Sequence, residues 1–148
     1  MKHNLLLFLV IACFPTSIFA QDLQVTPQQG VALIKQGRIS AVLEPILEYD
    51  VDIINGQTVF SEGYEPDAKY IAFDPSTKNI GLVPVTGPRS GQVISWSAIP
   101  IETDKNDIAR FYAYTNSGGF EIYLTSRDDL YIVVFFYRED LIVAYSCK

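Results

Sequence analysis

The chain has 148 residues, of which 49% are hydrophobic and 13% aromatic, a composition that predicts one globular domain and excludes intrinsic disorder. Its 17 acidic residues outnumber 11 basic ones and give a formal net charge of −6. Because phosphate contacts need lysine and arginine, this balance argues against nucleic acid as a partner and against electrostatic attachment to anionic lipid.

The first 20 residues have the pattern of a signal peptide. Lys2 and His3 form a short basic region, residues 5–13 are apolar, and Ala20 is a small residue suited to the position before a cleavage site. The apolar stretch is too short to span a bilayer core of about 30 Å. We therefore expect residues 1–20 to be removed and residues 21–148 to form a single β-rich domain that is secreted or periplasmic.

A second processing signal overlaps the first. Val10 to Cys13 reads VIAC, which resembles a bacterial lipoprotein cleavage site with Cys13 acylated. The apolar region before Cys13 is short for such a signal, and the residues after it are more apolar than the usual polar tether. Anchoring to the envelope through Cys13 is therefore the alternative localisation.

Cleavage after Ala20 would remove the only histidine, His3, and one of the two cysteines. The remaining domain then has no Ser–His–Asp triad, no Cys–His pair and no histidine-based metal site. The carboxylate pair Glu44 and Glu48 is common in an acidic chain and does not by itself indicate a glycosidase. We expect no enzymatic activity, no cofactor and no metal.

Residues 26–37 predict a short helix. Thr26 is a suitable N-cap, Pro27 a suitable first helical residue, and Gln29 completes a capping box, whereas Gly37 stands where a helix would stop. The next segment, residues 38–60, is ambiguous because Pro45 argues against a long helix. Within it, Asn55-Gly56 between apolar residues predicts a tight hairpin turn.

From residue 67 onward the pattern predicts strand after strand. Short linkers between the runs favour antiparallel neighbours, so the expected fold is a meander of about seven strands with a short N-terminal helix. It is either a small barrel or a curved sheet packed on the helix, and the barrel is lipocalin-like by analogy of architecture only. The expected strands cover residues 69–73, 80–85, 93–99, 108–114, 119–125, 130–137 and 141–147.

Counting back from each turn predicts which residues share a face of the last four strands. One face is apolar throughout and forms the core, with Phe111 opposite Ile122, Phe120 opposite Phe135, and Phe135 opposite Val143. Half of the opposite face is also apolar and should be covered, by the helix, by the segment at Ile46 and Leu47, or by a second copy of the chain. The residues of that half are Ile132, Val134, Phe136, Ile142 and Ala144.

The rest of the opposite face is the candidate ligand-binding site. Arg110 falls opposite Tyr123 and Tyr112 opposite Glu121, with Trp96 as a further member if its strand presents it there. Tyrosine and arginine bind well through stacking, cation–π contacts and hydrogen bonds, although ordinary cross-strand pairing is the alternative interpretation. We expect Arg110 to lie across the Tyr123 ring with its guanidinium free, and Glu121 to hold Tyr112.

These observations predict a non-enzymatic binding domain for a small or partly apolar ligand. Such a protein would have a cavity behind Tyr131, Val133 and Tyr145. One alternative is a protein-binding inhibitor or immunity-type module, for which a negative charge suits a basic partner. Another is an envelope-anchored accessory lipoprotein that is acylated at Cys13. Cys147 is expected to be a buried hydrophobe or, second, to form a disulfide between chains, so a homodimer through Cys147 or the apolar sheet face is possible.

Overall fold

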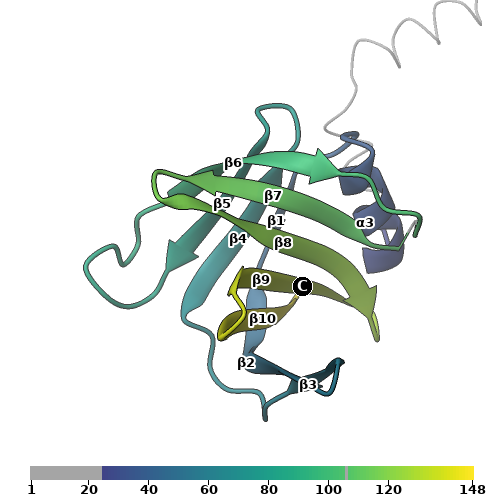
Figure 1. The fold of residues 1–148 in the computed structure, drawn as a ribbon. Helices are drawn as coiled ribbons and strands as arrows, with labels where there is room; N and C mark the ends of the chain where they lie inside the picture. Colours follow the sequence, from purple (N-terminus) through teal and green to yellow (C-terminus); the bar gives the residue numbers. More distant parts are fainter. Residues whose placement is uncertain (1–24, 106) are drawn as a thin grey trace, which may run out of the picture.

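The computed structural model describes residues 25–105 and 107–148. The expected signal peptide and the alternative acylation site at Cys13 lie outside these residues. The described chain is mainly β and has one short helix (Figure 1). In this described part, no helix is long and apolar enough to cross a membrane.

Ten strands form one antiparallel sheet in the order β1-β4-β5-β6-β7-β8-β9-β10-β2-β3. From β4 to β10 the spatial order follows the chain order, so the predicted meander is confirmed, and the additional strands come from the segment that the sequence left ambiguous. The strands are β1 (Ala41–Leu43), β2 (Pro45–Ile54), β3 (Gln57–Phe60), β4 (Ala68–Asp74), β5 (Asn79–Pro84), β6 (Ile94–Ile101), β7 (Ala109–Thr115), β8 (Gly118–Arg127), β9 (Leu130–Arg138) and β10 (Leu141–Cys147).

The sheet is strongly curved but is not closed into a barrel, so the curved-sheet alternative is correct and the barrel is wrong. The two ends of the open sheet are β1 and β3. Strands β1 and β2 are separated by Glu44 alone and yet pair with different partners, β4 and β10. Pro45 has no N–H to donate to a continuous ladder. Glu44 instead exchanges two backbone hydrogen bonds with Lys148, of 3.0 and 3.1 Å.

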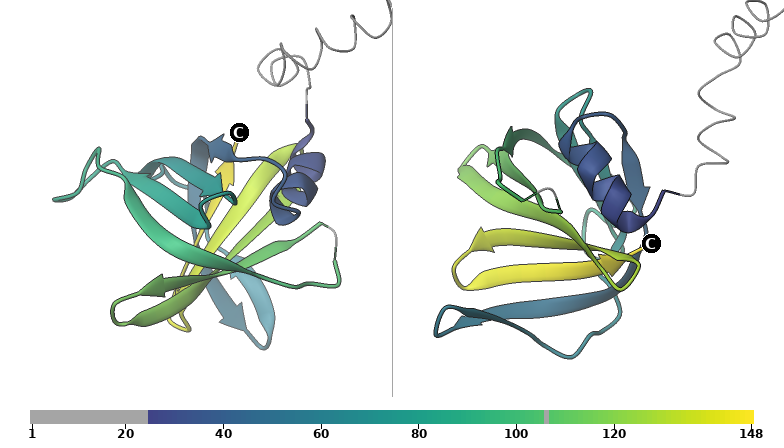
Figure 2. Two further views of the ribbon diagram at one scale, coloured as in Figure 1. Left: turned by 90° about the horizontal axis from the view of Figure 1, so that it is seen from above. Right: turned by 90° about the vertical axis from the view of Figure 1, so that its right-hand side faces the viewer.

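Helix α3 (Pro27–Lys35) begins and ends as the sequence predicts. The Thr26 hydroxyl accepts from the backbone N–H of Gln29, the Gln29 side chain accepts from the backbone N–H of Thr26, and Gly37 follows the helix with φ 71°. Val31 and Ile34 are buried in the main core. The helix lies against one side of the sheet (Figure 2). The helix therefore covers the core face of the sheet, and the expectation that it could cover the opposite face is wrong.

The predicted hairpin turn is also confirmed. Asn55 and Gly56 have φ values of 52° and 76°, and they connect Ile54 of β2 to its partner Gln57 of β3. Positive φ at both positions is typical of a type I′ turn, whose twist matches that of the two strands.

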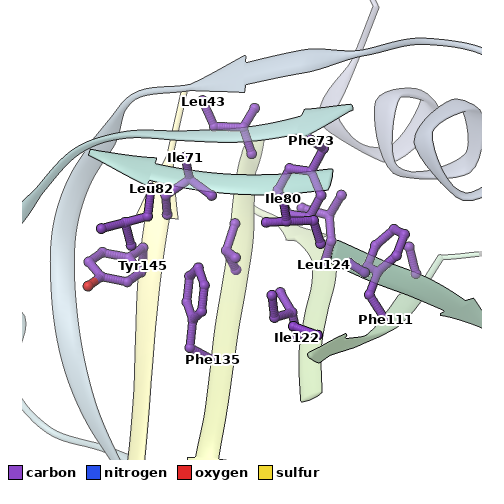
Figure 3. Packing of buried hydrophobic residues seen from close by; sticks show 14 of the residues in the cluster. Leu43, Ile71, Phe73, Ile80, Leu82, Phe111, Ile122, Leu124, Phe135 and Tyr145 are labelled. Atoms are coloured by element: carbon purple, nitrogen blue, oxygen red, sulfur yellow. The ribbon is translucent and has the colours of Figure 1, made fainter. Parts of the chain in front are cut away.

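The main core lies between β4–β5 and the long strands β7–β10 (Figure 3). Most predicted pairs are present, including Phe111 with Ile122 and Phe135 with Val143. The β8–β9 register differs by two residues from the expected one, because Ile122 rather than Phe120 pairs with Phe135.

The turn between β8 and β9 explains this difference. Asp128 and Asp129 have φ values of 51° and 60°, so the turn needs only two residues, and Arg127 and Leu130 still belong to the ladder. A shift of two residues leaves every side chain on its predicted face. Phe120 and Phe135 therefore still meet in the core, with their ring centroids 6.4 Å apart.

Candidate functional site

Four of the five predicted site residues lie together on the face of the sheet opposite the core, which we call the outer face. Arg110 is the partner of Tyr123, and Tyr112 is the partner of Glu121, as the register predicts. All four side chains are half-buried. Strands β7 and β8 thus place a basic, an acidic and two phenolic groups side by side.

Trp96, the fifth residue, lies on the core face and is not part of this group. Ala98 of β6 pairs with the buried Ala113, and Trp96 shares the face of Ala98 because it lies two positions before it in the strand. Its ring centroid lies 5.3 Å from that of Phe120 and 6.1 Å from that of Phe135. The β6–β7 pairing determines that the Trp96 side chain points to the core face, and turn lengths alone do not predict this pairing.

Arg110, Glu121 and Tyr123 form a connected cluster, the Arg110 cluster. The guanidinium donates two hydrogen bonds to the Glu121 carboxylate, from Nε at 2.9 Å and from Nη2 at 2.6 Å. The Tyr123 hydroxyl donates to the same carboxylate. The Arg110 guanidinium carbon also lies 5.5 Å from the centre of the Tyr123 ring. This bidentate geometry fixes all three side chains with respect to one another.

The charges in the Arg110 cluster balance. The hydrogen bond from Arg110 lowers the pKa of the Glu121 carboxyl, and the same bond raises the pKa of Arg110. Burial, followed by the hydrogen bond to Glu121, raises the pKa of the Tyr123 phenol. Glu121 is therefore an ionised acceptor and Tyr123 a neutral donor at neutral pH. Such groups suit recognition better than proton transfer.

Two details of the expected arrangement are wrong. The Arg110 guanidinium is paired with Glu121, although the Nη1 donors make no hydrogen bond to the described residues. Glu121 accepts from Tyr123, whereas Tyr112 lies edge-on to Tyr114, with ring centroids 5.0 Å apart. The Arg110 guanidinium can reach Glu121 on the neighbouring strand because the two residues lie diagonally across the β7–β8 pair.

An apolar groove of about 320 Å³ borders the Arg110 cluster and was not predicted from the sequence. Tyr123 belongs to both features. The groove lies on the outer face, where strand β2 comes to lie beside β10 and brings its own apolar side chains. Its lining includes Val51, Ile53, Tyr123, Val134, Phe136 and Ile142.

The groove shows how far the apolar half of the outer face is covered. Strand β2 extends the sheet rather than lying over it, but Val51 beside Ile142 leaves these two side chains only 6% and 5% exposed. Val134 and Phe136 stay half-buried at the groove. The segment at Ile46 and Leu47 forms part of β2 and does not cover this face, and a covering second copy stays a prediction.

A second groove of about 250 Å³ lies next to the first on the same face. Tyr49 and Phe60 form part of its lining, with their rings edge to face at 6.0 Å, and Ile132 contributes further apolar surface. The hydroxyl of Ser146 also belongs to this lining, is buried, and makes no hydrogen bond to the described residues. Buried hydroxyls normally have a partner, so this one is suited to a polar group of a ligand.

Glu48, one of the carboxylates considered from the sequence, is buried and fully engaged. Its carboxylate accepts from the backbone N–H of Asp67 at 2.6 Å and from the Tyr64 hydroxyl at 3.3 Å. The same hydroxyl donates to the Asp50 carboxylate at 3.0 Å. Burial, followed by the hydrogen bond to Asp50, raises the pKa of Tyr64. These bonds attach the segment after β3 to strand β2.

Cys147 is fully buried in the main core. Burial raises the pKa of its thiol to about 12, so the reactive thiolate is absent at neutral pH. This position matches the role of a small buried hydrophobe. A disulfide to another chain would require the end of β10 to open.

No three histidine, cysteine, aspartate or glutamate side chains within residues 25–105 and 107–148 are grouped to hold a metal ion. Comparison with protein-family models, with curated proteins and with solved structures gives no match to this chain.

Proposed function

We propose that the protein is an exported, non-enzymatic binding domain that takes a partly apolar ligand on the outer face of its sheet. The observation that carries this proposal is the apolar groove of about 320 Å³ beside the Arg110 cluster. Ligand sites are typically apolar and concave, with a few well-placed polar groups that fix orientation.

The core face near Val133 and Tyr145 is a poorer candidate because side chains fill it. Val133 is fully buried and Tyr145 is 6% exposed, and both belong to the main core. The rings of Phe135 and Tyr145 meet edge to face at 5.8 Å in the region where a cavity was expected. Between helix α3 and strands β4–β6 the structure has a pocket of about 160 Å³, half the volume of the groove on the outer face, so the outer face accommodates a ligand better.

The proposed ligand has an apolar body and a hydrogen-bond acceptor. The apolar body occupies the groove against Val134 and Phe136, while the acceptor meets the remaining donors of Arg110 at the rim. Because Glu121 already holds Arg110 and Tyr123, binding requires little additional ordering of these side chains. A carboxylate or a sulfonate on an apolar scaffold has this chemistry.

Anilinonaphthalene sulfonate is a suitable first probe, since it joins an aromatic body to an anionic acceptor. We expect saturable fluorescence enhancement with the wild-type protein, and at least tenfold weaker binding for Tyr123→Ala and Arg110→Ala. Circular dichroism confirms that each variant is folded. Thr115→Ala, at the far end of β7, is the matched control and should bind like wild type. Binding that survives both substitutions would contradict the proposal.

The alternative function remains a protein-binding inhibitor or immunity-type module. Its support is the negative charge of the chain and the apolar side chains that stay exposed on the β2–β3 hairpin outside the grooves, such as Ile54 and Val59 at 53% and 44%. An isolated small ligand would not need these residues. Lipid anchoring through Cys13 remains the alternative to free export.

A further inference from the structure

Acidic residues are concentrated in one segment of the chain. Residues 44–67 contain seven aspartates and glutamates and no lysine, arginine or histidine. This segment comprises strands β2 and β3, their turn and the residues that lead toward β4. A partner that contacts this part of the molecule meets a strongly negative field, which favours a basic partner.

The hairpin sorts its side chains into two faces. Glu48, Asp50 and Asp52 alternate along β2 on one face, whereas Tyr49 and Val51 point to the outer face. Strand β3 follows the same division, with Val59 opposite Asp52 and Phe60 opposite Val51. The hairpin is thus acidic on one side and apolar on the other.

Strand β3 is the last strand of the sheet, and its outer edge has no neighbour among the described residues (Figure 1). In the antiparallel hairpin, the pairs Ile54–Gln57 and Asp52–Val59 exchange hydrogen bonds, because the tight turn sets that alternation. The N–H and C=O groups of Thr58 and Phe60 therefore point away from β2. All four residues of β3 are exposed.

This edge lacks the features that normally protect a free strand. Gln57–Phe60 contains no charged residue and no proline, and its pairing with β2 has no bulge. At the opposite end of the sheet, β1 has only three residues, and Glu44 after it is bonded to Lys148. The unprotected edge is therefore specific to β3.

We propose that the free edge of β3 binds an extended segment of another protein, in which basic and apolar residues alternate, as an eleventh strand of the sheet. Residues opposite Thr58 and Phe60 would extend the apolar face, and the residue opposite Val59 would lie on the acidic face. That residue would lie two strand spacings, about 10 Å, from the backbone of Asp52. A lysine or arginine at this position is long enough to pair with the Asp52 carboxylate.

A second copy of this chain is a poor occupant for the edge. Pairing β3 with β3 of another molecule would place two acidic hairpins side by side, and each carries the Asp50 and Asp52 carboxylates on its exposed face. A basic segment neutralises the same charges instead. The inference concerns the strand edge and does not depend on a ligand in the apolar groove.

The test uses a capped, fluorescein-labelled heptapeptide of alternating lysine and valine, with a glutamate–valine peptide of the same length as its control. We expect the full domain to bind the lysine peptide in fluorescence anisotropy and not the glutamate peptide. Amide exchange of Thr58 and Phe60, followed by NMR, should slow when the lysine peptide is added. Absence of saturable binding up to millimolar peptide would overturn the proposal.

Two pairs of variants locate the interaction. Thr58→Pro removes the outward N–H without removing a bond to β2, and we expect at least tenfold weaker binding, whereas Thr58→Val keeps the N–H and should bind like wild type. Asp52→Asn should weaken binding about two- to fivefold, and the exposed Asp104→Asn should leave it unchanged. Undiminished binding by both Thr58→Pro and Asp52→Asn would also overturn the proposal.

Discussion

Phe135 is the residue on which the aromatic packing of the core converges. It is fully buried, and its ring has four aromatic neighbours, which are Trp96, Phe120, Tyr137 and Tyr145. Phe136, the next residue, points to the outer face and stays half-buried. Two adjacent phenylalanines thus have very different surroundings.

This difference predicts different stabilities for two alanine variants. Phe135→Ala should lower the free energy of unfolding by about 3–5 kcal/mol, because it removes buried aromatic surface and leaves a cavity among rings. Phe136→Ala should cost clearly less, since part of its ring already contacts solvent. Urea denaturation of both variants checks this. Equal losses would mean that the two faces are wrongly assigned.

Glu121 predicts a dependence of stability on pH. Its pKa is lowered in the folded protein, so the stability it contributes is present above its ordinary pKa of 4.5 and is lost as the pH falls through the lowered pKa. The Glu121 and Arg110 side chains are 28% and 35% exposed, so screening by solvent holds this contribution to about 1 kcal/mol or less.

The measurement compares wild type with Glu121→Gln by urea denaturation from pH 7 to pH 2. Wild type should be the more stable protein at pH 7, and the difference should shrink on acidification, because the carboxyl is protonated as the pH falls through its lowered pKa. A difference that grows on acidification would contradict the ionised state of Glu121.

At the scale of elements, helix α3 packs closely against strand β9 of the sheet at Gly30. A methyl group placed on Gly30 would overlap the hydroxyl of Tyr131 on β9. Glycine inside a helix normally costs about 1 kcal/mol relative to alanine. The close packing of the helix against Tyr131 explains why position 30 is a glycine despite this cost.

We therefore predict that Gly30→Ala destabilises the protein, although alanine is the better helix former. The expected overpacking of about 1–3 kcal/mol exceeds the gain in helix propensity of about 1 kcal/mol. Thermal unfolding of Gly30→Ala and of Gly30→Ala with Tyr131→Phe tests this. The double variant should recover part of the loss, and a single variant more stable than wild type would contradict the close approach.

The elements that the sequence predicts well are those with local signals. Thr26 and Gln29 determine the start of α3, Asn55-Gly56 determines the hairpin, and alternation determines which residues of the late strands face the core. The β8–β9 register was wrong by two residues because Asp128 and Asp129 adopt positive φ, which residues other than glycine seldom do.

The site was predictable only where it depends on neighbouring strands. Arg110, Tyr112, Glu121 and Tyr123 lie within one hairpin, so counting from its turn placed them together. The groove instead needs β2 beside β10, a pairing between segments about 90 residues apart that no local pattern encodes. The side of the sheet that Trp96 faces likewise depends on tertiary pairing.

At the scale of the whole molecule, the processed form is the first prediction to check. We expect the exported protein to begin at Gln21 or within a few residues of it, because Ala20 ends the small-residue site behind the apolar region. Intact-mass spectrometry of the exported protein decides this. A species that begins at Cys13 and carries acyl mass would instead establish the lipoprotein.

The strand order also has a consequence for synthesis. Strand β2 is made before β4 to β9, yet its neighbour in the main sheet is β10, which follows it by about 90 residues. Until β10 emerges, β2 and β9 both present unpaired edges, and the sheet cannot be completed. Such late, non-local pairing folds slowly and exposes strands to aggregation. The nascent chain is therefore vulnerable for as long as β2 waits for β10, and a holding chaperone would act on it during that interval.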